Sequence, residues 1–258
     1  MKVGGVLAEY NFRDLNKYEG KTEIDGISIT EGFKFAEFNS LDNDLYLIER
    51  DAPTPPEKEI TESIAYMQGN YDFSIIDNER YFNNRDLTFK LTAFKMNYPD
   101  RKILENKVKS ALMPFGKQQI YDTHNQNMYW FGKCKSVSVE DNQDKNTLSV
   151  TIVFDCYPFA IYEYLEGNDV WDIFNFTSDI SQKVDFEVNG NKEIVLINNG
   201  SHRSELLIVV DGDISINGIP FKTGEYKDTQ IVLNVGINNI KLSGKGSVSF
   251  NWRKELMV

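Results

Sequence analysis

The residues that could perform chemistry are few and far apart in the sequence. The chain holds two histidines, His124 and His202, and two cysteines, Cys134 and Cys156. A nucleophilic site needs a serine or cysteine beside a base, and neither histidine lies in a recognisable nucleophile motif. A zinc site needs Cys and His ligands at short spacing, and the sequence has no such cluster. We therefore expect both histidines to be solvent-exposed polar residues.

Acidic residues and glycines are the other candidates for a site. With 39 Asp and Glu, many carboxylate pairs could be named for a glycosidase, and none stands out. The acidic loops 42–51 and 140–146 lack the spacing and closing glutamate of a hand-type calcium loop. The glycines of MKVGGV and SGKGS lack the Lys-Ser/Thr ending of a phosphate-binding loop. The sequence predicts no catalytic, cofactor or metal site, and a hydrolase with unrecognised carboxylates remains the least favoured alternative.

The overall charge disfavours some classes of binding partner. A net charge of −11 opposes binding to nucleic acid, which needs clustered Lys and Arg. No apolar run approaches the length of a membrane span. The opening MKVGGVLAEYNFRD lacks the apolar core and cleavage site of a signal peptide. We expect synthesis in the cytoplasm, with no secretion signal, no membrane association and no specific nucleic-acid partner.

Periodicity predicts a mainly β chain with one helix. Strands with one buried face are predicted at NRDLTFKLTAF, residues 84–94, and at LSVTIVFDC, residues 148–156. In YPDRKILENKVKSALMPFG, Pro99 and Asp100 mark a helix start and Pro114 a stop. The predicted helix, near residues 100–113, carries an apolar side made of Ile103, Leu104, Val108, Ala111 and Leu112.

The same alternation predicts that the two cysteines do not pair. The apolar residues of YWFGKCKSVSVE are odd-numbered, whereas the buried face of residues 148–156 is even-numbered. If DNQDKN between them is a hairpin loop, Cys134 lies on the opposite face from Cys156. We therefore expect no disulfide bond.

A change of composition predicts two domains. The strand ending at Cys156 runs into Tyr157-Pro158, and proline cannot continue a hydrogen-bonded ladder. Beyond Tyr164, short alternating strands are separated by NG, DG, TG and SG steps, at the spacing of a β-sandwich. We predict an α+β domain over residues 1–160 and an all-β domain over residues 165–258.

Several segments of the first domain resemble one known family when they are taken in order. They are IAYMQGNYDFS, NRDLTFKLTAF, the helix with ENKVKSAL, GKQQIYDTHNQNMYWFGKCKSVSVE with its Tyr129-Trp130 step, and TIVFDCYPF. Together they cover residues 64–159 and resemble the distal tail protein (Dit) family of siphophages that infect Gram-positive bacteria.

The resemblance implies both architecture and partners. It implies an N-terminal β-sandwich with one helix that forms a hexameric ring, with stacked rings as a further possibility. It also implies a C-terminal galectin-like or carbohydrate-module-like β-sandwich. The ring would be a structural, non-enzymatic baseplate hub in the virion, at the tail tip. Its partners would be the tail tube protein and a tail-associated lysin, tail fibre or receptor-binding protein.

Two candidate surfaces follow. The proline-rich stretch 51–59 is a candidate assembly arm that would contact a neighbouring subunit or tail component, although a plain surface loop is the alternative. Its named residues are Asp51, Pro53, Pro55, Pro56 and Glu57. The alternative function is a non-catalytic carbohydrate-binding protein, in which exposed Phe221, Tyr226 or Trp252 would stack on a sugar. A galectin site itself is not expected, because its His, Asn, Arg, Trp and Glu set is not recognisable here.

Overall fold

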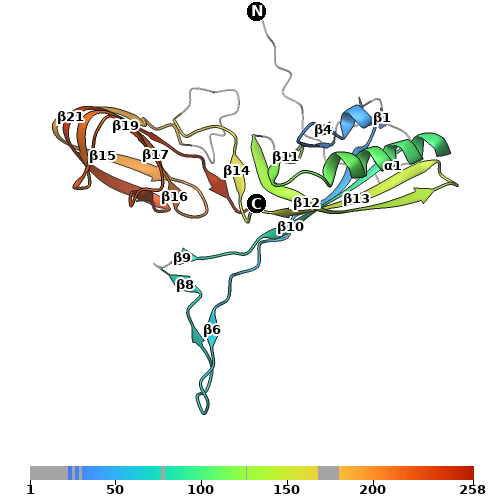
Figure 1. Ribbon diagram of the computed structural model, residues 1–258, viewed down its shortest axis with the longest axis horizontal. Coiled ribbons are helices and arrows are strands. Elements are labelled where there is room, and N and C mark those ends of the chain that lie inside the picture. The colour runs from blue at the N-terminus through green and yellow to red at the C-terminus, as the bar shows by residue number, and fades with distance from the viewer. Residues whose placement is uncertain (1–22, 25–26, 29–30, 77–78, 126, 168–179) are drawn as a thin grey trace, which may run out of the picture. The chain divides into compact units, whose positions relative to one another are not determined.

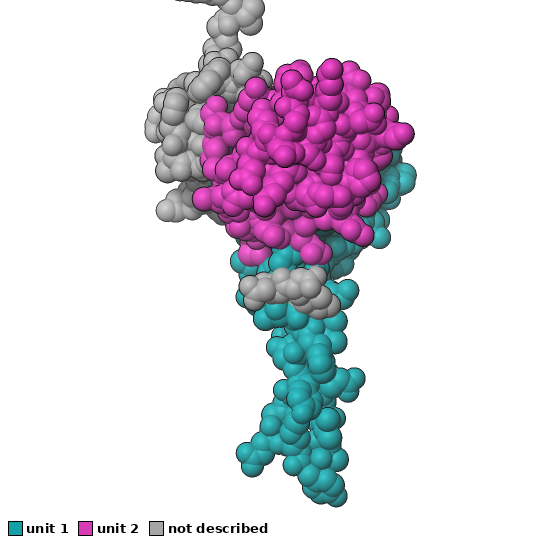
Figure 2. All heavy atoms as spheres, turned by 90° about the vertical axis from the view of Figure 1, so that its left-hand side faces the viewer, with its two compact units in different colours: residues 1–158 teal, residues 159–258 magenta. Residues whose placement is uncertain are grey.

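A computed structural model describes the chain from residue 23 onward, except residues 25–26, 29–30, 77–78, 126 and 168–179 (Figure 1). The predictions about Met1 to Gly20 lie outside the described residues. The chain divides into two compact units, unit 1 with residues 1–158 and unit 2 with residues 159–258 (Figure 2). The sequence had placed the change of domain between residues 160 and 165, and the structure divides the chain after Pro158.

Unit 1 is built on one antiparallel sheet. Its centre is the pair β10 and β13, where Leu87 lies opposite Phe154 and Leu91 opposite Val150. Alternate residues of both strands are fully buried, as the period-2 pattern requires. In sheet order the strands are β4 (Phe38–Asn39), β3 (Phe33–Phe35), β11 (Gln118–Asp122), β12 (Met128–Asn142), β13 (Thr147–Cys156), β10 (Arg85–Ala93) and β5 (Tyr46–Asp51). A separate two-stranded hairpin, β1 (Glu23–Ile24) and β2 (Ile27–Ser28), precedes them.

Phenylalanines fill the core of unit 1. The ring centroids of Phe33 and Phe89 are 5.2 Å apart, and those of Phe35 and Phe154 are also 5.2 Å apart. The interplanar angles, 43° and 50°, are tilted rather than parallel, which suits aromatic quadrupoles. Residues from β3, β10 and β13 thus meet in one aromatic cluster, which fixes the sheet that carries the candidate site.

The helix α1 spans Tyr98–Leu112 and packs against β4 and β12. Asn97 caps it, because its side-chain oxygen accepts a 3.0 Å hydrogen bond from the backbone N–H of Asp100. Leu104, Val108 and Leu112 are buried along one side. The assignment of Ile103 to that side is wrong, since its side chain is 65% exposed. Arg101 takes the buried place instead, and its Nε donates to Asp141 Oδ1 of β12 at 2.6 Å.

The reasoning that separated the two cysteines is wrong, although both are free thiols. A bulge between Cys134 and Ser136 shifts the β12–β13 register by one residue. Before the bulge Gly132 lies opposite Cys156 and Cys134 opposite Phe154, so both cysteines face the same side of the sheet. They are diagonal neighbours, whose separation of about 7 Å or more exceeds the reach of a disulfide.

Unit 2 is a β structure around its own apolar core, with no helix among its described residues. Its longest antiparallel pair joins β15 (Asp185–Asn198) to β21 (Gly236–Asn251) over the full length of β15. The main sheet continues from β21 to β17 (Leu207–Ile216), which pairs with β18 (Ile219–Phe221) and β19 (Gly224–Tyr226). Two short pairs complete it, β16 (Ser204–Glu205) with β20 (Val232–Leu233), and β14 (Ala160–Tyr162) with β22 (Glu255–Leu256).

The predicted fold class, mainly β with two sheet regions, is confirmed, and the described residues contain one α-helix. Within the described residues, no helix combines the length and the apolar character needed to cross a membrane.

Candidate functional site: an arm and the cluster at its root

The candidate site is a long arm that leaves the unit 1 sheet at the end of β5 and returns at the start of β10 (Figure 1). Asp51 is the last residue of β5, so the predicted stretch 51–59 is only the outgoing root of an arm that extends over residues 52–84. Pro53 and Pro56 are exposed there, whereas Pro55 is buried. Prolines hold this root extended, because each fixes one backbone dihedral and donates no hydrogen bond.

The outgoing leg of the arm, which follows β5, and the returning leg, which precedes β10, are joined by backbone hydrogen bonds. Glu57 bridges Phe82 across the root, and the N–H of Lys58 donates to Tyr81 O at 2.8 Å. Arg80 binds the Glu57 carboxylate through two nitrogens, and this lowers the pKa of Glu57. Farther out, β6 (Thr61–Glu62) pairs with β7 (Tyr71–Asp72), and β8 (Ile75–Ile76) forms a small hairpin with β9 (Glu79–Arg80).

The outer part of the arm exposes apolar side chains. Of the sixteen large hydrophobic residues that are exposed in the described chain, six lie on the arm. Isolated exposed apolar residues are ordinary, but a contiguous group on a thin projection is typical of an interaction surface. The six are Ile60, Ile64, Tyr66, Tyr71, Phe73 and Ile75.

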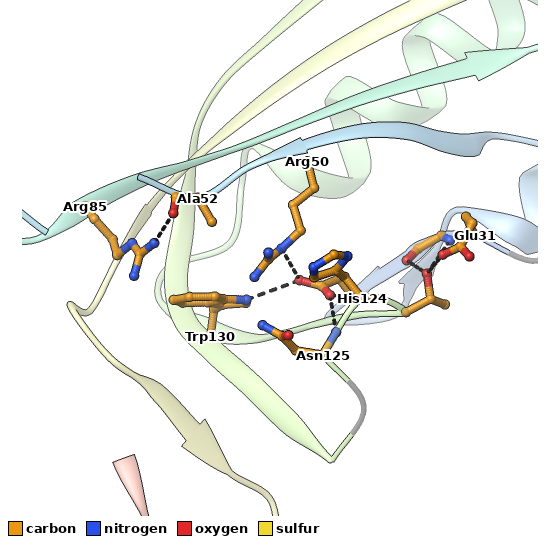
Figure 3. Close-up of polar contacts among 10 residues, drawn as sticks. Glu31, Arg50, Ala52, Arg85, His124, Asn125 and Trp130 are labelled. Carbon is orange, nitrogen blue, oxygen red and sulfur yellow. Dashed lines mark hydrogen bonds and ion pairs between the residues drawn. The ribbon is translucent and has the colours of Figure 1, made fainter. Parts of the chain in front are cut away.

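A buried cationic and aromatic cluster lies where the arm joins the sheet (Figure 3). Arg50, at the end of β5, and Arg85, the first residue of β10, both face the ring of Trp130. Their guanidinium carbons lie 5.4 Å and 4.7 Å from the ring centroid, within the range of a cation–π interaction. Trp130 is 1% exposed, so this interaction is shielded from water. The two legs of the arm are thereby tied to one ring.

Asp122, at the end of β11, orders this cluster. Its Oδ2 accepts hydrogen bonds from Arg50 Nε and Trp130 Nε1, each at 3.2 Å. Its Oδ1 accepts from the backbone N–H groups of His124 and Asn125 at 2.8 Å and 2.9 Å. The carboxylate is therefore fully used by donors, which is the condition under which a buried charge is tolerated.

Arg85 connects the cluster to the outgoing leg. Its Nη2 donates to the carbonyl of Ala52, the first residue of the arm, and its Nη1 donates to Pro158 O at 3.4 Å. Burial, followed by the nearby charge of Arg50, lowers the pKa of Arg85. Burial is also the main cause that lowers the pKa of His124, again with Arg50 contributing. The site thus concentrates positive charge at the root and fixes the direction of the arm.

Both histidines differ from expectation, because each is half-buried. His124 belongs to the loop beside Asp122. His202 Nε2 lies 2.5 Å from Glu255 Oε2, and its ring centroid lies 4.2 Å from that of Phe159. Among the described residues, no three His, Cys, Asp or Glu side chains gather closely enough to hold a metal ion.

The candidate sugar-contacting aromatics are placed differently from what was predicted. The expectation that Phe221 and Trp252 are exposed is wrong, since they are 7% and 3% exposed and belong to the core of unit 2. Tyr226 is half-buried, and its hydroxyl donates to Lys222 O at 3.0 Å. Phe221 is the last residue of β18 and Trp252 follows the end of β21, and both rings pack into the core of unit 2. A sugar could reach Tyr226 alone among the three.

Sequence reasoning missed the apolar outer arm and the root cluster. A signal for the first existed, because SIAYMQGNY, residues 63–71, is an uncharged run between acidic residues. No local signal existed for the second, because Arg50, Arg85, Asp122 and Trp130 come from four strands that only the folded sheet brings together.

Comparison with solved structures identifies a protein of similar fold. No protein-family model matches the chain, and a search of curated proteins finds no match. Among solved structures, the chain is similar to the Dit protein of phage SPP1, described as "a Paradigm of Hub Adsorption Apparatus in Gram-positive Infecting Phages". The TM-score is 0.63 and the identity 11%, and the match covers 88% of this chain and 99% of that chain. A chain of the phage P2 baseplate matches 89% of this chain and 99% of its own at 8% identity, with a TM-score of 0.39. The chain has the fold that the sequence resemblance to the Dit family predicted.

Proposed function

We propose that the protein is a Dit-like structural hub of a phage tail, a component of the virion that acts without catalysis. The observation that carries this proposal is the likeness to SPP1 Dit, which extends over 99% of that chain. A hub needs a rigid scaffold and self-complementary surfaces rather than a catalytic constellation. The buried aromatic core of unit 1 and the anchored arm supply such a scaffold.

We propose a hexameric ring as the assembled form. The arm is a surface that differs from the rest of unit 1, so an arm that binds a neighbour makes a head-to-tail contact. Repeated head-to-tail contacts either close into a ring or grow into a filament, and a hub requires closure. The root residues Asp51, Pro53, Pro55, Pro56 and Glu57 give the arm an extended start, which favours contact with a neighbour over a fold-back.

The remaining partners follow from the position of a hub in a phage tail, between the tail tube and the tail tip. One face of the ring would meet the tail tube protein, and the other a tail-associated lysin, tail fibre or receptor-binding protein. Stacking of two rings would be a second mode of self-association. Unit 2, with its own core, would stand as a peripheral module.

The proposal is tested by the mass of the purified chain in solution. A hexamer has six times the 29.7 kDa of one chain, about 178 kDa. Sedimentation velocity over a concentration series is expected to show this species growing at the expense of the monomer. A protein that remains at 29.7 kDa throughout would overturn the proposal.

The alternative, a carbohydrate-binding module, has less support because two of its three candidate aromatics are buried. It would gain support if the monomer bound an immobilised glycan and Tyr226→Ala abolished that binding.

A further inference from the structure

A groove runs beside α1 in unit 1, at the end of the helix that is remote from its N-cap. Its volume is about 490 Å³. Phe38 is nearly buried in it, whereas Phe115 is 43% exposed at its border. The groove therefore presents aromatic surface together with polar groups. Its lining residues are Glu37, Phe38, Asn39, Asp42, Asn43, Lys107, Ser110, Ala111 and Phe115.

The exposed side of α1 extends this groove. Ile103, Lys107 and Ala111 follow one another at four-residue spacing, so they lie on one side of the helix. Ile103 is 65% exposed, and no other described element covers it. The result is an apolar stripe with one cation in its middle, continuous with the groove.

Lys107 is the one cation in the lining of the groove, whose opposite wall carries the carboxylates Glu37 and Asp42. Its neighbours Lys102 and Lys109 both bind Glu105, at 3.1 Å and 2.6 Å. No ion pair or hydrogen bond of the Lys107 side chain is found within the described part of the chain. The segment 98–117 carries five Lys and Arg against two Asp and Glu, in a chain whose net charge is −11. Arg101, Lys102 and Lys109 are already paired with carboxylates of their own copy, so Lys107 is the cation that this wall of the groove offers to a single carboxylate of a partner.

The outer arm has the complementary character. Residues 63–71 carry no charge, and Ile64 and Tyr66 are 55% and 108% exposed. Glu59 and Glu62, just before them, are exposed, and the described residues give neither of them an ion-pair partner. An uncharged apolar tip can enter a groove without the cost of desolvating a charge, while a flanking carboxylate can meet a lysine.

The arm is long enough to reach another copy. From Ala52 to Met67 the outgoing leg has 16 residues, which span about 50 Å when extended. A unit of this size has a radius of about 20 Å. Figure 1 shows the arm running away from α1, and therefore away from the groove of its own copy.

We propose that the tip of one copy's arm, residues 63–71, docks in the α1 groove of a second copy, with Glu62 facing Lys107. This inference rests on the proposed ring and identifies the contact that builds it. Each copy offers one tip and one groove on different surfaces, so the contact is head-to-tail and can close. Glu37 and Asp42, on the other wall of the groove, would meet the uncharged polar groups of the tip rather than its flanking carboxylates.

Cysteine cross-linking tests the contact in the full-length chain. The variant carries Met67→Cys in the tip and Ser110→Cys in the groove, and mild oxidation is followed by a non-reducing gel. Burial raises the pKa of the native thiols, to about 11 for Cys134 and about 12 for Cys156, so they do not compete. We expect bands at multiples of the chain mass. A matched control with Met67→Cys and the exposed Asn191→Cys of unit 2 is expected to give none.

The outcomes separate this inference from the proposed function. Rings in electron micrographs without tip-to-groove cross-links would overturn the docking and leave the hub intact. A cross-link within single chains would also overturn it, because the arm would then occupy its own groove. A chain that never associates would overturn both.

Charge reversal gives a second, independent test. Lys107→Glu would place like charges together, and we expect about tenfold weaker association. Adding Glu62→Lys on the same chain is expected to restore association, because the pair is rebuilt with opposite signs. Lys245→Glu, at an exposed site of unit 2, makes the same charge change away from the groove and serves as control. Failure of Glu62→Lys to restore association in the Lys107→Glu background would contradict the assigned contact.

Discussion

Removing apolar surface from the outer arm should weaken assembly without weakening the fold. The variant is Tyr66→Ser with Phe73→Ser, two residues that are 108% and 53% exposed. Burying a fully exposed aromatic side chain contributes about 2 kcal/mol, so Tyr66 would contribute about 2 and the half-exposed Phe73 about 1. A loss of about 3 kcal/mol weakens each subunit contact about 100-fold, since 1.4 kcal/mol is a factor of ten. Exposed positions of this kind change the free energy of unfolding by only about 0.5 kcal/mol.

The assay is sedimentation velocity across a concentration series, paired with thermal unfolding of the same samples. We expect the midpoint of assembly to move about 100-fold to higher concentration while the melting temperature stays within error. The control is Val195→Ser with Ile237→Ser, which removes comparably exposed apolar residues from unit 2. An equal shift in the control, or an arm variant that assembles like the parent chain, would refute the reasoning.

Three further predictions concern the root cluster, the thiols and the two units. Asp122→Ala leaves the buried Arg50 without its carboxylate, so the free energy of unfolding measured by denaturant titration should fall by about 3 to 5 kcal/mol. An unchanged unfolding midpoint would contradict the stabilising role of the cluster. Cys134 and Cys156 should resist thiol reagents at pH 8 until denaturant is added, and rapid labelling of the folded protein would argue against their burial. The free energy of unfolding should also fall as the pH rises from about 9 toward 11 and 12, because each thiol ionises more readily in the unfolded chain. A fragment of residues 1–160 should still form rings by mass measurement, and association confined to the complementary fragment would reverse the roles proposed for the two units.

Elements with strong local patterns were predictable from the sequence. The even-numbered alternation of residues 148–156 predicted β13, and Pro99, Asp100 and Pro114 predicted the bounds of α1. These predictions held because one buried face, or one cap, fixes each element locally. The inward-facing Phe221 and Trp252 show the limit of such patterns, because which rings are covered depends on the packing of strands that are remote in sequence.

Two features could not be predicted for a physical reason. One bulged residue near Lys135 reverses the alternation of β12. The residues of β12 before the bulge therefore face the side of the sheet opposite to the one predicted. The root cluster depends on four strands whose order in the sheet differs from their order in the chain. Only the start of the arm was predicted, because its prolines are a local signal. The length of the arm depends on where the chain rejoins the sheet, at the first residue of β10.

The central claim is that this chain is a ring-forming hub, and electron microscopy of the purified protein tests it most directly. At concentrations well above micromolar, we expect class averages with six-fold symmetry around a central opening, each copy contributing one unit 1 to the ring. Class averages that contain only particles of the size of a single chain at those concentrations would contradict it.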